Sequence, residues 1–222
     1  MPTTLAFDVY GTLIDTHGIS VQLQKYIGAK APPFAKLWRE KQLEYSFRRA
    51  LMQNYVDFSV CVSDALDYTS LFFGVDLDLE GKKELLNAYN VLPPFDDVTE
   101  GLTRAKASGF RMFAFSNGTA ETVERLLSNA GIRDYFLGII SVDEMKSFKP
   151  NPAVYSYFLR ASGSVGADAW LISSNSFDVI GAISSGLRGV WVRRSAEALF
   201  DPWSIEPTLT VNGLSDLAEQ IG

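Results

Sequence analysis

Hydrophobic and polar positions fall into two different patterns along this chain. Between residues 16 and 91 the apolar residues recur at three- and four-residue intervals, which is typical of amphipathic helices. Phe34 and Trp38 show this spacing, and Pro32 and Pro33 precede them, as the start of a helix allows. The pattern predicts helices over 19–28, 34–53, 57–73 and 79–90, with no convincing strand among them.

After Pro93 and Pro94 the pattern changes to short apolar runs that alternate with amphipathic segments. Strands are predicted over 4–10, 111–116, 136–141, 169–173, 189–193 and 208–211, and helices over 97–108, 119–130, 152–162, 178–185 and 214–221. Such alternation indicates an α/β fold: a doubly wound parallel sheet, Rossmann-like, with helices on both faces. We therefore expect a catalytic core from 1–15 and 93–222, with 16–92 inserted as an all-helical cap.

Length and charge limit the classes of function. The chain has 222 residues, which fits one domain with an insertion, and its formal net charge is −6. No basic stripe is visible, so a nucleic-acid partner has little electrostatic support. The acidic balance also disfavours anionic membranes, and no apolar stretch approaches the roughly 20 residues that cross a bilayer. A small anionic substrate would need local positive charge, for which Arg39 and Lys149 are candidates.

Cysteine, histidine and glycine usage narrows the chemistry further. Cys61 is the only cysteine, so an intramolecular disulfide is impossible, which suits a cytoplasmic location. Asp8 interrupts the first apolar run, unlike the apolar segment of a secretion signal. The chain offers no His/Cys cluster for zinc and no dinucleotide-binding glycine fingerprint. The one histidine, His17, follows the first strand, where a hinge or cap contact is a better interpretation than catalysis.

Asp8 is the most informative single residue. It ends an apolar run and is followed by a turn at Gly11. A carboxylate at the carboxyl end of a strand lies where open α/β sheets hold ligands, and there it can act as a nucleophile that forms a covalent ester. An ordinary turn aspartate is the alternative.

Polar residues also follow the other predicted strands. They are Ser116 and Asn117 after the second strand, Lys149 after the third, and Ser173, Asn175 and Asp178 after the fourth. If these strands are parallel neighbours, a nucleophile, hydroxyl donors, a cation and a second carboxylate share one crevice.

The motifs Asp-x-Tyr-Gly-Thr-Leu, Ser-Asn-Gly, Lys-Pro-x-x-x-x-Tyr and Ser-Ser-Asn-x-x-Asp occur in this order. The chain thereby resembles the haloacid dehalogenase-like superfamily over nearly its whole length. Within it, the chain looks like the L-2-haloacid dehalogenase (type II) branch, because residues 37–45 are similar to the branch's helix that carries a halide-binding arginine, here Arg39. Its neighbours one helical turn away are not acidic, so the usual helix salt bridge is unavailable to Arg39.

Phosphatases of the superfamily need a second aspartate two residues after the first, and Tyr10 stands there instead. Ser174 and Asn175 occupy positions where those enzymes place a metal-binding acid, which leaves Asp178. Magnesium usually requires more than one carboxylate, so phosphoryl transfer is poorly served. We expect neither a metal nor another cofactor, and a metal-dependent phosphatase is the less favoured alternative.

The resemblance implies hydrolysis of short (S)-2-haloalkanoic acids to (R)-2-hydroxyalkanoic acids and halide through an aspartyl ester on Asp8. Arg39 would receive the halide, Lys149 would compensate the charge of Asp8, and Asp178 would activate water. The other implied catalytic residues are Thr12, Ser116, Tyr155, Ser173 and Asn175. Implied substrate or halide contacts are Tyr10, Arg39, Leu43, Phe58, Ser116, Asn117 and Phe177.

Plain structural roles compete with several of these assignments. Phe58 could be a core aromatic, Asn117 a turn residue, and Asp178 the N-cap of the next helix. Two other functions stay open: the same attack on fluoroacetate or a strained ring, and mere binding of small carboxylates. The resemblance also suggests a homodimer.

Overall fold

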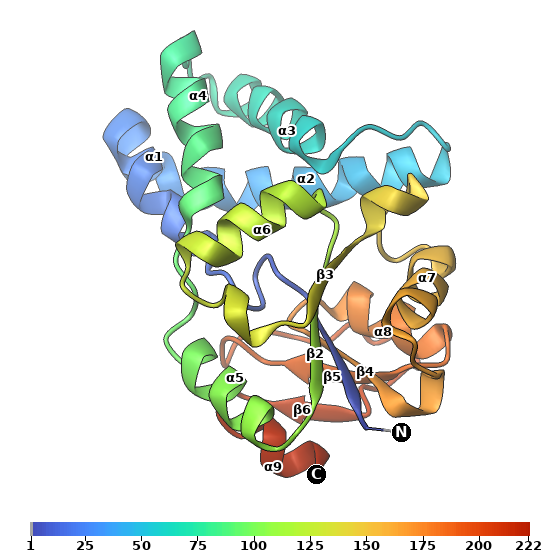
Figure 1. The fold of residues 1–222 in the computed structure, drawn as a ribbon. Helices are drawn as coiled ribbons and strands as arrows, with labels where there is room; N and C mark the ends of the chain where they lie inside the picture. The colour runs from blue at the N-terminus through green and yellow to red at the C-terminus, as the bar shows by residue number, and fades with distance from the viewer. Residues whose placement is uncertain (1) are drawn as a thin grey trace.

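The structure is a computed structural model that describes residues 2–222. Six parallel strands form one sheet in the order β3-β2-β1-β4-β5-β6 (Figure 1). The strands are β1 (Thr4–Phe7), β2 (Arg111–Ser116), β3 (Gly138–Ser141), β4 (Ala169–Ser173), β5 (Arg188–Val192) and β6 (Leu209–Val211). The central strands β1 and β4 are fully buried, as expected of a parallel sheet covered on both faces. The predicted α/β fold is confirmed.

The order of the strands reverses beside β1. Phe7 of β1 pairs with Ala114 of β2 on one side and with Ile172 of β4 on the other. The backbone N–H of Asp8 donates to the carbonyl of Ile172 at 3.0 Å, so the ladder continues one residue beyond β1. The carboxyl ends of β1 and β4 therefore form the switch point at which open α/β sheets bind ligands.

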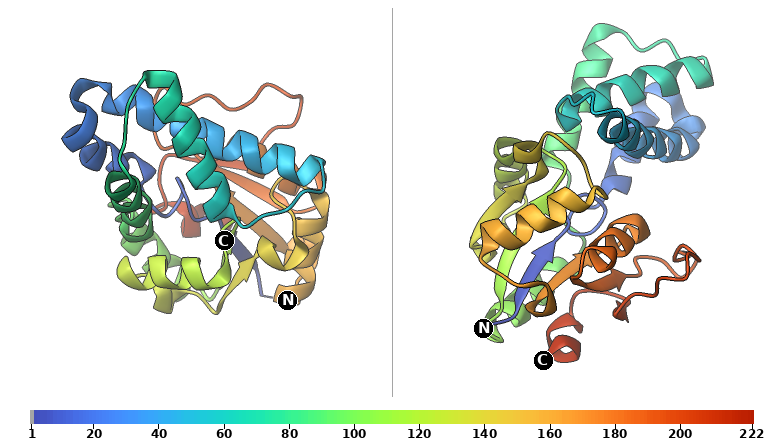
Figure 2. Two further views of the ribbon diagram at one scale, coloured as in Figure 1. Left: turned by 90° about the horizontal axis from the view of Figure 1, so that it is seen from above. Right: turned by 90° about the vertical axis from the view of Figure 1, so that its right-hand side faces the viewer.

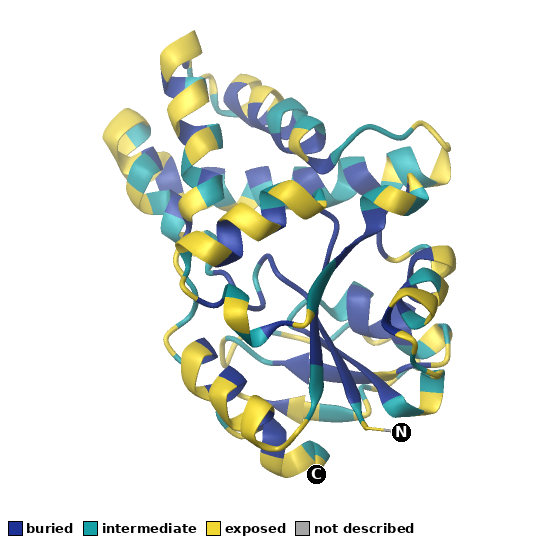
Figure 3. Ribbon diagram, in the orientation of Figure 1, coloured by how far each residue is buried: buried dark blue, intermediate teal, exposed yellow. Residues whose placement is uncertain are grey.

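Helices cover both faces of this sheet, as the alternating pattern predicted. Figure 1 shows α5 (Val98–Ala107), α6 (Ala120–Asn129) and α9 (Leu217–Ile221) on one side, and α7 (Pro152–Ser162) and α8 (Ser176–Ser184) on the other. The core helices turn their apolar faces toward the strands, so in Figure 3 the central strands are buried, whereas the outer surfaces of helices such as α5 and α6 are exposed.

The insertion after β1 is helical. It contains α1 (Ile19–Ile27), α2 (Ala31–Leu51), α3 (Phe58–Phe73) and α4 (Leu79–Ala88), with single 3₁₀ turns η1 (Thr16–Gly18), η2 (Gly28–Lys30) and η3 (Tyr89–Val91). Figures 1 and 2 show these helices above the carboxyl ends of the strands. The aromatic rings of Phe34 and Trp38, both fully buried, hold α2 against its neighbours. The predicted helical cap is confirmed.

Several element bounds differ from the prediction. Strand β1 ends at Phe7, three residues early, because Val9 O accepts the N–H groups of Leu13 and Ile14 in a tight turn. Gly11 permits this turn, since its φ is 84°. Pro32 and Pro33 lie inside the first turn of α2, where a missing N–H costs nothing.

The start of α8 also differs. Asn175 holds the N-cap position, and Asp178 lies in the first helical turn. The alternative interpretation of Asp178 as the N-cap is therefore wrong. The last helix, α9, begins at Leu217 because residues 214–216 form a turn before it.

The two connections to the cap lie side by side. The N–H of Asp15 donates to Pro93 O at 2.9 Å, and the N–H of Phe95 donates to Leu13 O at 3.0 Å. On the basis of these two hydrogen bonds we propose the division that the sequence predicted, with a core of 1–15 and 93–222 and a cap of 16–92.

Within residues 2–222, every helix is too short or too polar to span a bilayer.

Candidate active site

The Asp8 carboxylate lies at the switch point and is nearly buried. Its Oδ2 accepts hydrogen bonds from Thr12 Oγ1 at 2.9 Å, Ser173 Oγ at 3.1 Å and Asn175 Nδ2 at 2.8 Å. Its Oδ1 accepts from Lys149 Nζ at 3.1 Å. One oxygen thus receives three donors and the other only the lysine. Burial raises the pKa of Asp8, but Lys149 and Thr12 outweigh that effect and hold the pKa below its usual value.

Lys149 joins the two acidic residues of the site. Its buried ammonium donates to Asp178 Oδ2 at 2.7 Å, to Asp8 Oδ1 at 3.1 Å and to the Phe115 carbonyl at 2.8 Å. Burial alone would lower the pKa of Lys149, yet the two carboxylates raise it above the usual value. The lysine therefore stays charged while three acceptors satisfy its three N–H groups.

Asp178 is fully buried at the start of α8. Its Oδ1 accepts the Tyr155 hydroxyl at 2.7 Å, and its Oδ2 accepts Lys149. Burial raises the pKa of Asp178 to about 6, against the opposing effect of Lys149. A carboxylate with such a pKa is well matched to accept a proton near neutral pH. Tyr155 therefore contacts Asp178 directly.

The cap contributes Arg39, which is half-buried on α2. Its guanidinium donates to the Tyr10 carbonyl and to Gln42 Oε1, both at 3.4 Å. Among residues 2–222, no carboxylate lies within salt-bridge distance of Arg39. The neighbouring Glu40 is exposed and lies 4.0 Å from Lys36. Arg39 therefore presents an uncompensated positive charge close to Asp8.

Ser116 ends β2, and Asn117 follows it, beside the same cluster. The Ser116 hydroxyl accepts from Gly118 N at 3.1 Å, and in the described chain it forms no hydrogen bond with Asp8. Asn117 Oδ1 accepts the backbone N–H of Lys149 at 2.9 Å and so fixes the lysine's loop to β2. The Asn117 amide N–H₂ has no acceptor within residues 2–222 and is available to a ligand.

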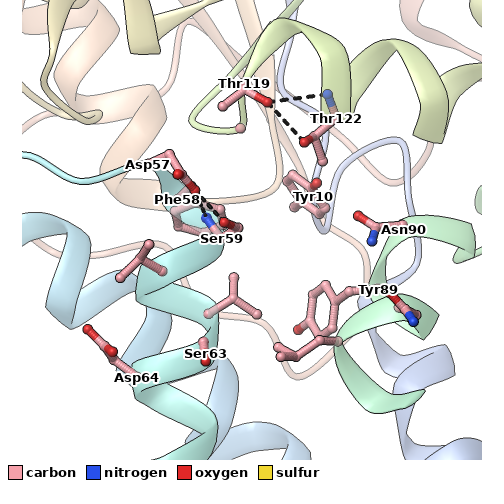
Figure 4. A pocket seen from close by; sticks show the side chains of 15 residues that line it. Tyr10, Asp57, Phe58, Ser59, Ser63, Asp64, Tyr89, Asn90, Thr119 and Thr122 are labelled. Atoms are coloured by element: carbon pink, nitrogen blue, oxygen red, sulfur yellow. Dashed lines mark hydrogen bonds between the residues drawn. The ribbon is translucent and has the colours of Figure 1, made fainter. Parts of the chain in front are cut away.

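Three aromatic rings lie next to this cluster. The ring of Tyr10 lies 6.0 Å from that of Phe58 and 6.5 Å from that of Tyr89. All three line a cavity of about 340 Å³ between α3, η3 and the start of α6 (Figure 4). Asp8 does not itself line this cavity, but Tyr10, two residues after it, does.

The other implied contact residues lie elsewhere. Leu43 is half-buried on α2, one helical turn after Arg39. Phe177 contacts Phe47 edge to face at 4.9 Å, where α8 meets α2, and lines a second, wider cavity of about 660 Å³. His17 is exposed and contacts Asp15 at 3.0 Å, outside the cluster.

Sequence reasoning missed three polar residues at the site. Gln42 and Tyr89 are buried and hydrogen-bonded to each other, and Ser174 Oγ donates to the Gly11 carbonyl at 2.7 Å. Gln42 was detectable because it is a polar residue three positions after Arg39 on a helix with a buried face. No feature of the sequence pointed to Tyr89, which lies near the end of the helix predicted over 79–90. Across residues 2–222, no three His, Cys, Asp or Glu side chains converge as a metal site.

A family model for haloacid dehalogenase-like hydrolases matches residues 2–186. The chain belongs to this family. Curated relatives place this haloacid dehalogenase-like hydrolase in the L-2-haloacid dehalogenase branch, as the motifs indicated. It is 34% identical to the (S)-2-haloacid dehalogenase of Pseudomonas sp. strain YL, over 97% of this chain and 92% of the relative. It is 35% identical to haloacetate dehalogenase H-2 of Moraxella sp. strain B, over 93% and 92%.

Solved structures agree with this placement. The L-2-haloacid dehalogenase of Xanthobacter autotrophicus superposes with a TM-score of 0.91 at 30% identity, over 100% of this hydrolase and 98% of that chain. The same enzyme with chloropropionic acid covalently bound gives the same values.

Proposed function

We propose that this protein is an (S)-2-haloacid dehalogenase that works through a covalent ester on Asp8. One observation carries the proposal: Arg39, which has no salt-bridge partner in the described chain, lowers the pKa of a buried carboxylate, Asp8, whose two oxygens are in different environments. The covalently bound chloropropionate of the Xanthobacter enzyme, in the same fold, supports a covalent route here.

In the first step Asp8 Oδ1 attacks carbon 2 of the substrate from the side opposite the halogen. Oδ1 is the better nucleophile because Oδ2 is occupied by three donors. A carbon–oxygen bond forms, the carbon–halogen bond breaks, and the halide leaves with the bonding pair. Arg39 and the free amide of Asn117 receive the halide, so it needs no proton.

The second step regenerates Asp8. Asp178 takes a proton from water, which attacks the ester carbonyl carbon of Asp8. The negative charge then develops on Oδ2, where Thr12, Ser173 and Asn175 already donate; these donors act as an oxyanion hole. The tetrahedral intermediate then collapses: the bond between the Asp8 carbonyl carbon and Oδ1 breaks, and the product leaves with Oδ1 and takes the proton held by Asp178. The bond between Oδ1 and carbon 2 stays intact throughout, so the product keeps the inversion of the first step.

The test is halide release from (S)-2-chloropropionate in the presence of EDTA, with chiral analysis of the lactate formed. Chloride and (R)-lactate in equal amounts support the proposal. No chloride, together with a phosphatase activity that EDTA removes, would overturn it in favour of the metal-dependent alternative.

A second candidate uses the same site on a smaller or stronger electrophile. The resemblance to haloacetate dehalogenase H-2 favours it, as does a TM-score of 0.84 to a defluorinating L-2-haloacid dehalogenase at 26% identity. Fluoroacetate, chloroacetate and an epoxide carboxylate tested beside 2-chloropropionate would rank these substrates. A protein that only binds carboxylates would release no halide from any of them.

A small halogenated carboxylate is thus the proposed partner. A homodimer stays a prediction, and the exposed apolar residues Tyr68, Leu71 and Phe72 on α3 are compatible with it. Light scattering on the purified protein would decide it. The cytoplasmic location also stays a prediction, based on cysteine usage.

A further inference from the structure

Gln42 is a polar residue in a fully buried position of the cap. Burying a primary amide without partners is costly, so both ends of such a side chain need hydrogen bonds. Gln42 Nε2 donates to the Tyr89 hydroxyl at 3.1 Å, and Gln42 Oε1 accepts from Arg39 at 3.4 Å. The amide therefore connects the arginine of the site to a tyrosine on another cap segment.

Packing of its ring holds the Tyr89 hydroxyl in place as the partner of Gln42. Its ring packs edge to face on Trp38 with centroids 5.0 Å apart, and the indole of Trp38 donates to Val62 O at 2.9 Å. Figure 4 shows the Tyr89 ring extending from η3 into the cavity described above. The hydroxyl is thus a rigid acceptor that sets the orientation of the Gln42 amide.

The neutrality of the amide matters as much as its position. Arg39 and Gln42 are three residues apart and share a helix face, so position 42 could equally hold a carboxylate in a salt bridge with Arg39. Such a pair would cancel the charge that an anion needs. Gln42 and the Tyr10 carbonyl instead orient the guanidinium through neutral oxygens and leave its charge intact.

We propose that Gln42, held by Tyr89, is a positioning residue that fixes Arg39 and keeps its charge available to the departing halide. The inference rests on the function proposed for Arg39. It assigns to a buried cap pair a part in carbon–halogen cleavage, although neither residue touches Asp8.

The test compares Gln42→Met, Gln42→Glu and Tyr89→Phe with the control Ser46→Ala. Ser46 is also buried on α2, one turn further, and its hydroxyl donates only to Leu43 O. The readout is the single-turnover rate of ester formation from 2-chloropropionate and from 2-bromopropionate. Chloride leaves less readily than bromide, so a misplaced Arg39 slows the chloro substrate more.

In Gln42→Met we expect ester formation from the chloro substrate to slow roughly 10- to 100-fold, the scale of small misplacements in a site. The ratio of bromo to chloro rates should rise several-fold. Gln42→Glu should be slower still, Tyr89→Phe should shift the ratio less, and Ser46→Ala should leave it unchanged. A ratio that stays at the wild-type value in both Gln42 variants overturns the inference, even if their rates fall.

A different measurement tests the positioning role if the proposed function is wrong. If the wild-type protein releases no halide, the readout becomes the affinity for bromide, followed by tryptophan fluorescence. Weaker bromide binding in Gln42→Glu and unchanged binding in Ser46→Ala support the positioning role, whereas equal affinities in wild type and Gln42→Glu overturn it.

Discussion

The Tyr155 hydroxyl donates to Asp178 Oδ1 at 2.7 Å and lies 3.2 Å from the carbonyl oxygen of the same residue. Both residues are buried, and the Tyr155 ring packs edge to face on Phe115 with centroids 5.9 Å apart. The tyrosine therefore stabilises the ionised form of Asp178 from the side opposite Lys149. Removing only the Tyr155 hydroxyl should therefore raise the pKa of Asp178.

The acidic limb of ester hydrolysis should have a midpoint below about pH 6, because the base must be ionised. Burial raises the pKa of Asp178 to about 6 while Asp8 is charged, and esterification removes the Asp8 charge that contributes to this rise. The Tyr155 hydrogen bond lowers this pKa, so Tyr155→Phe should move the midpoint to higher pH and reduce activity most at pH 5 to 6. Hydrolysis rates of the preformed ester across pH measure this. Tyr157→Phe, two residues further on α7, is the control, and an equal shift in it would contradict the prediction.

Oxygen from water should enter Asp8 and not the first molecule of product. In H₂¹⁸O under single turnover, the product hydroxyl comes from Asp8, and solvent oxygen replaces it in the carboxylate. Mass spectrometry of peptides should find a gain of about 2 Da in the Asp8 peptide and none in the Asp178 peptide. Label in the hydroxy acid instead would indicate direct attack by water. The Asp178→Asn variant should accumulate the ester.

Arg39→Ala should reduce kcat for 2-chloropropionate by about 10²-fold or more, the scale of losing one electrostatic contact in a transition state. Arg39→Lys should recover part of the loss because the charge returns without the fork of N–H donors. Arg48→Ala is the control on the same helix, since Arg48 is exposed and pairs with Glu44. Comparable losses in Arg39→Ala and Arg48→Ala would point to damage of α2 instead.

Arg194 should contribute to the stability of the core. It binds both carboxylate oxygens of Asp97, at 2.7 and 2.8 Å, and its guanidinium lies 4.2 Å from the ring centroid of Phe95. Arg194→Met leaves Asp97 without its cation, so we expect a loss of about 2 kcal/mol in the free energy of unfolding. Urea denaturation, with Arg193→Met as the neighbouring control, measures it.

The periodicity of the apolar residues predicted most of the fold, and the polar residues at the strand ends predicted most of the site. Helix–strand alternation predicted the parallel sheet, and the polar residues after four strands predicted which side chains meet at Asp8. Prediction worked because the carboxyl ends of parallel strands share one edge of the sheet. Thr12, Lys149 and Ser173 lie where this rule places them, each within 3.1 Å of an Asp8 oxygen.

The rest depends on contacts between distant segments, which periodicity does not encode. The contact of Tyr155 with Asp178 depends on the packing of α7 against α8. The link from Gln42 to Tyr89 joins residues 47 positions apart in the sequence. The early end of β1 reflects a turn closed by Val9 O, which the apolar pattern through Tyr10 concealed.

The side-by-side connections at Asp15 and Pro93 have a consequence for engineering. In the proposed mechanism the nucleophile, its base and its lysine come from the core, whereas the arginine that receives the leaving group comes from the insertion. The insertion that carries Arg39 is one contiguous stretch of the gene, flanked on both sides by the stretches that encode the core, and of the proposed halide contacts only Asn117 comes from that core. An exchange of the insertion between related proteins at these two neighbouring junctions should change which halogen or chain length is accepted, while the displacement chemistry is inherited unaltered.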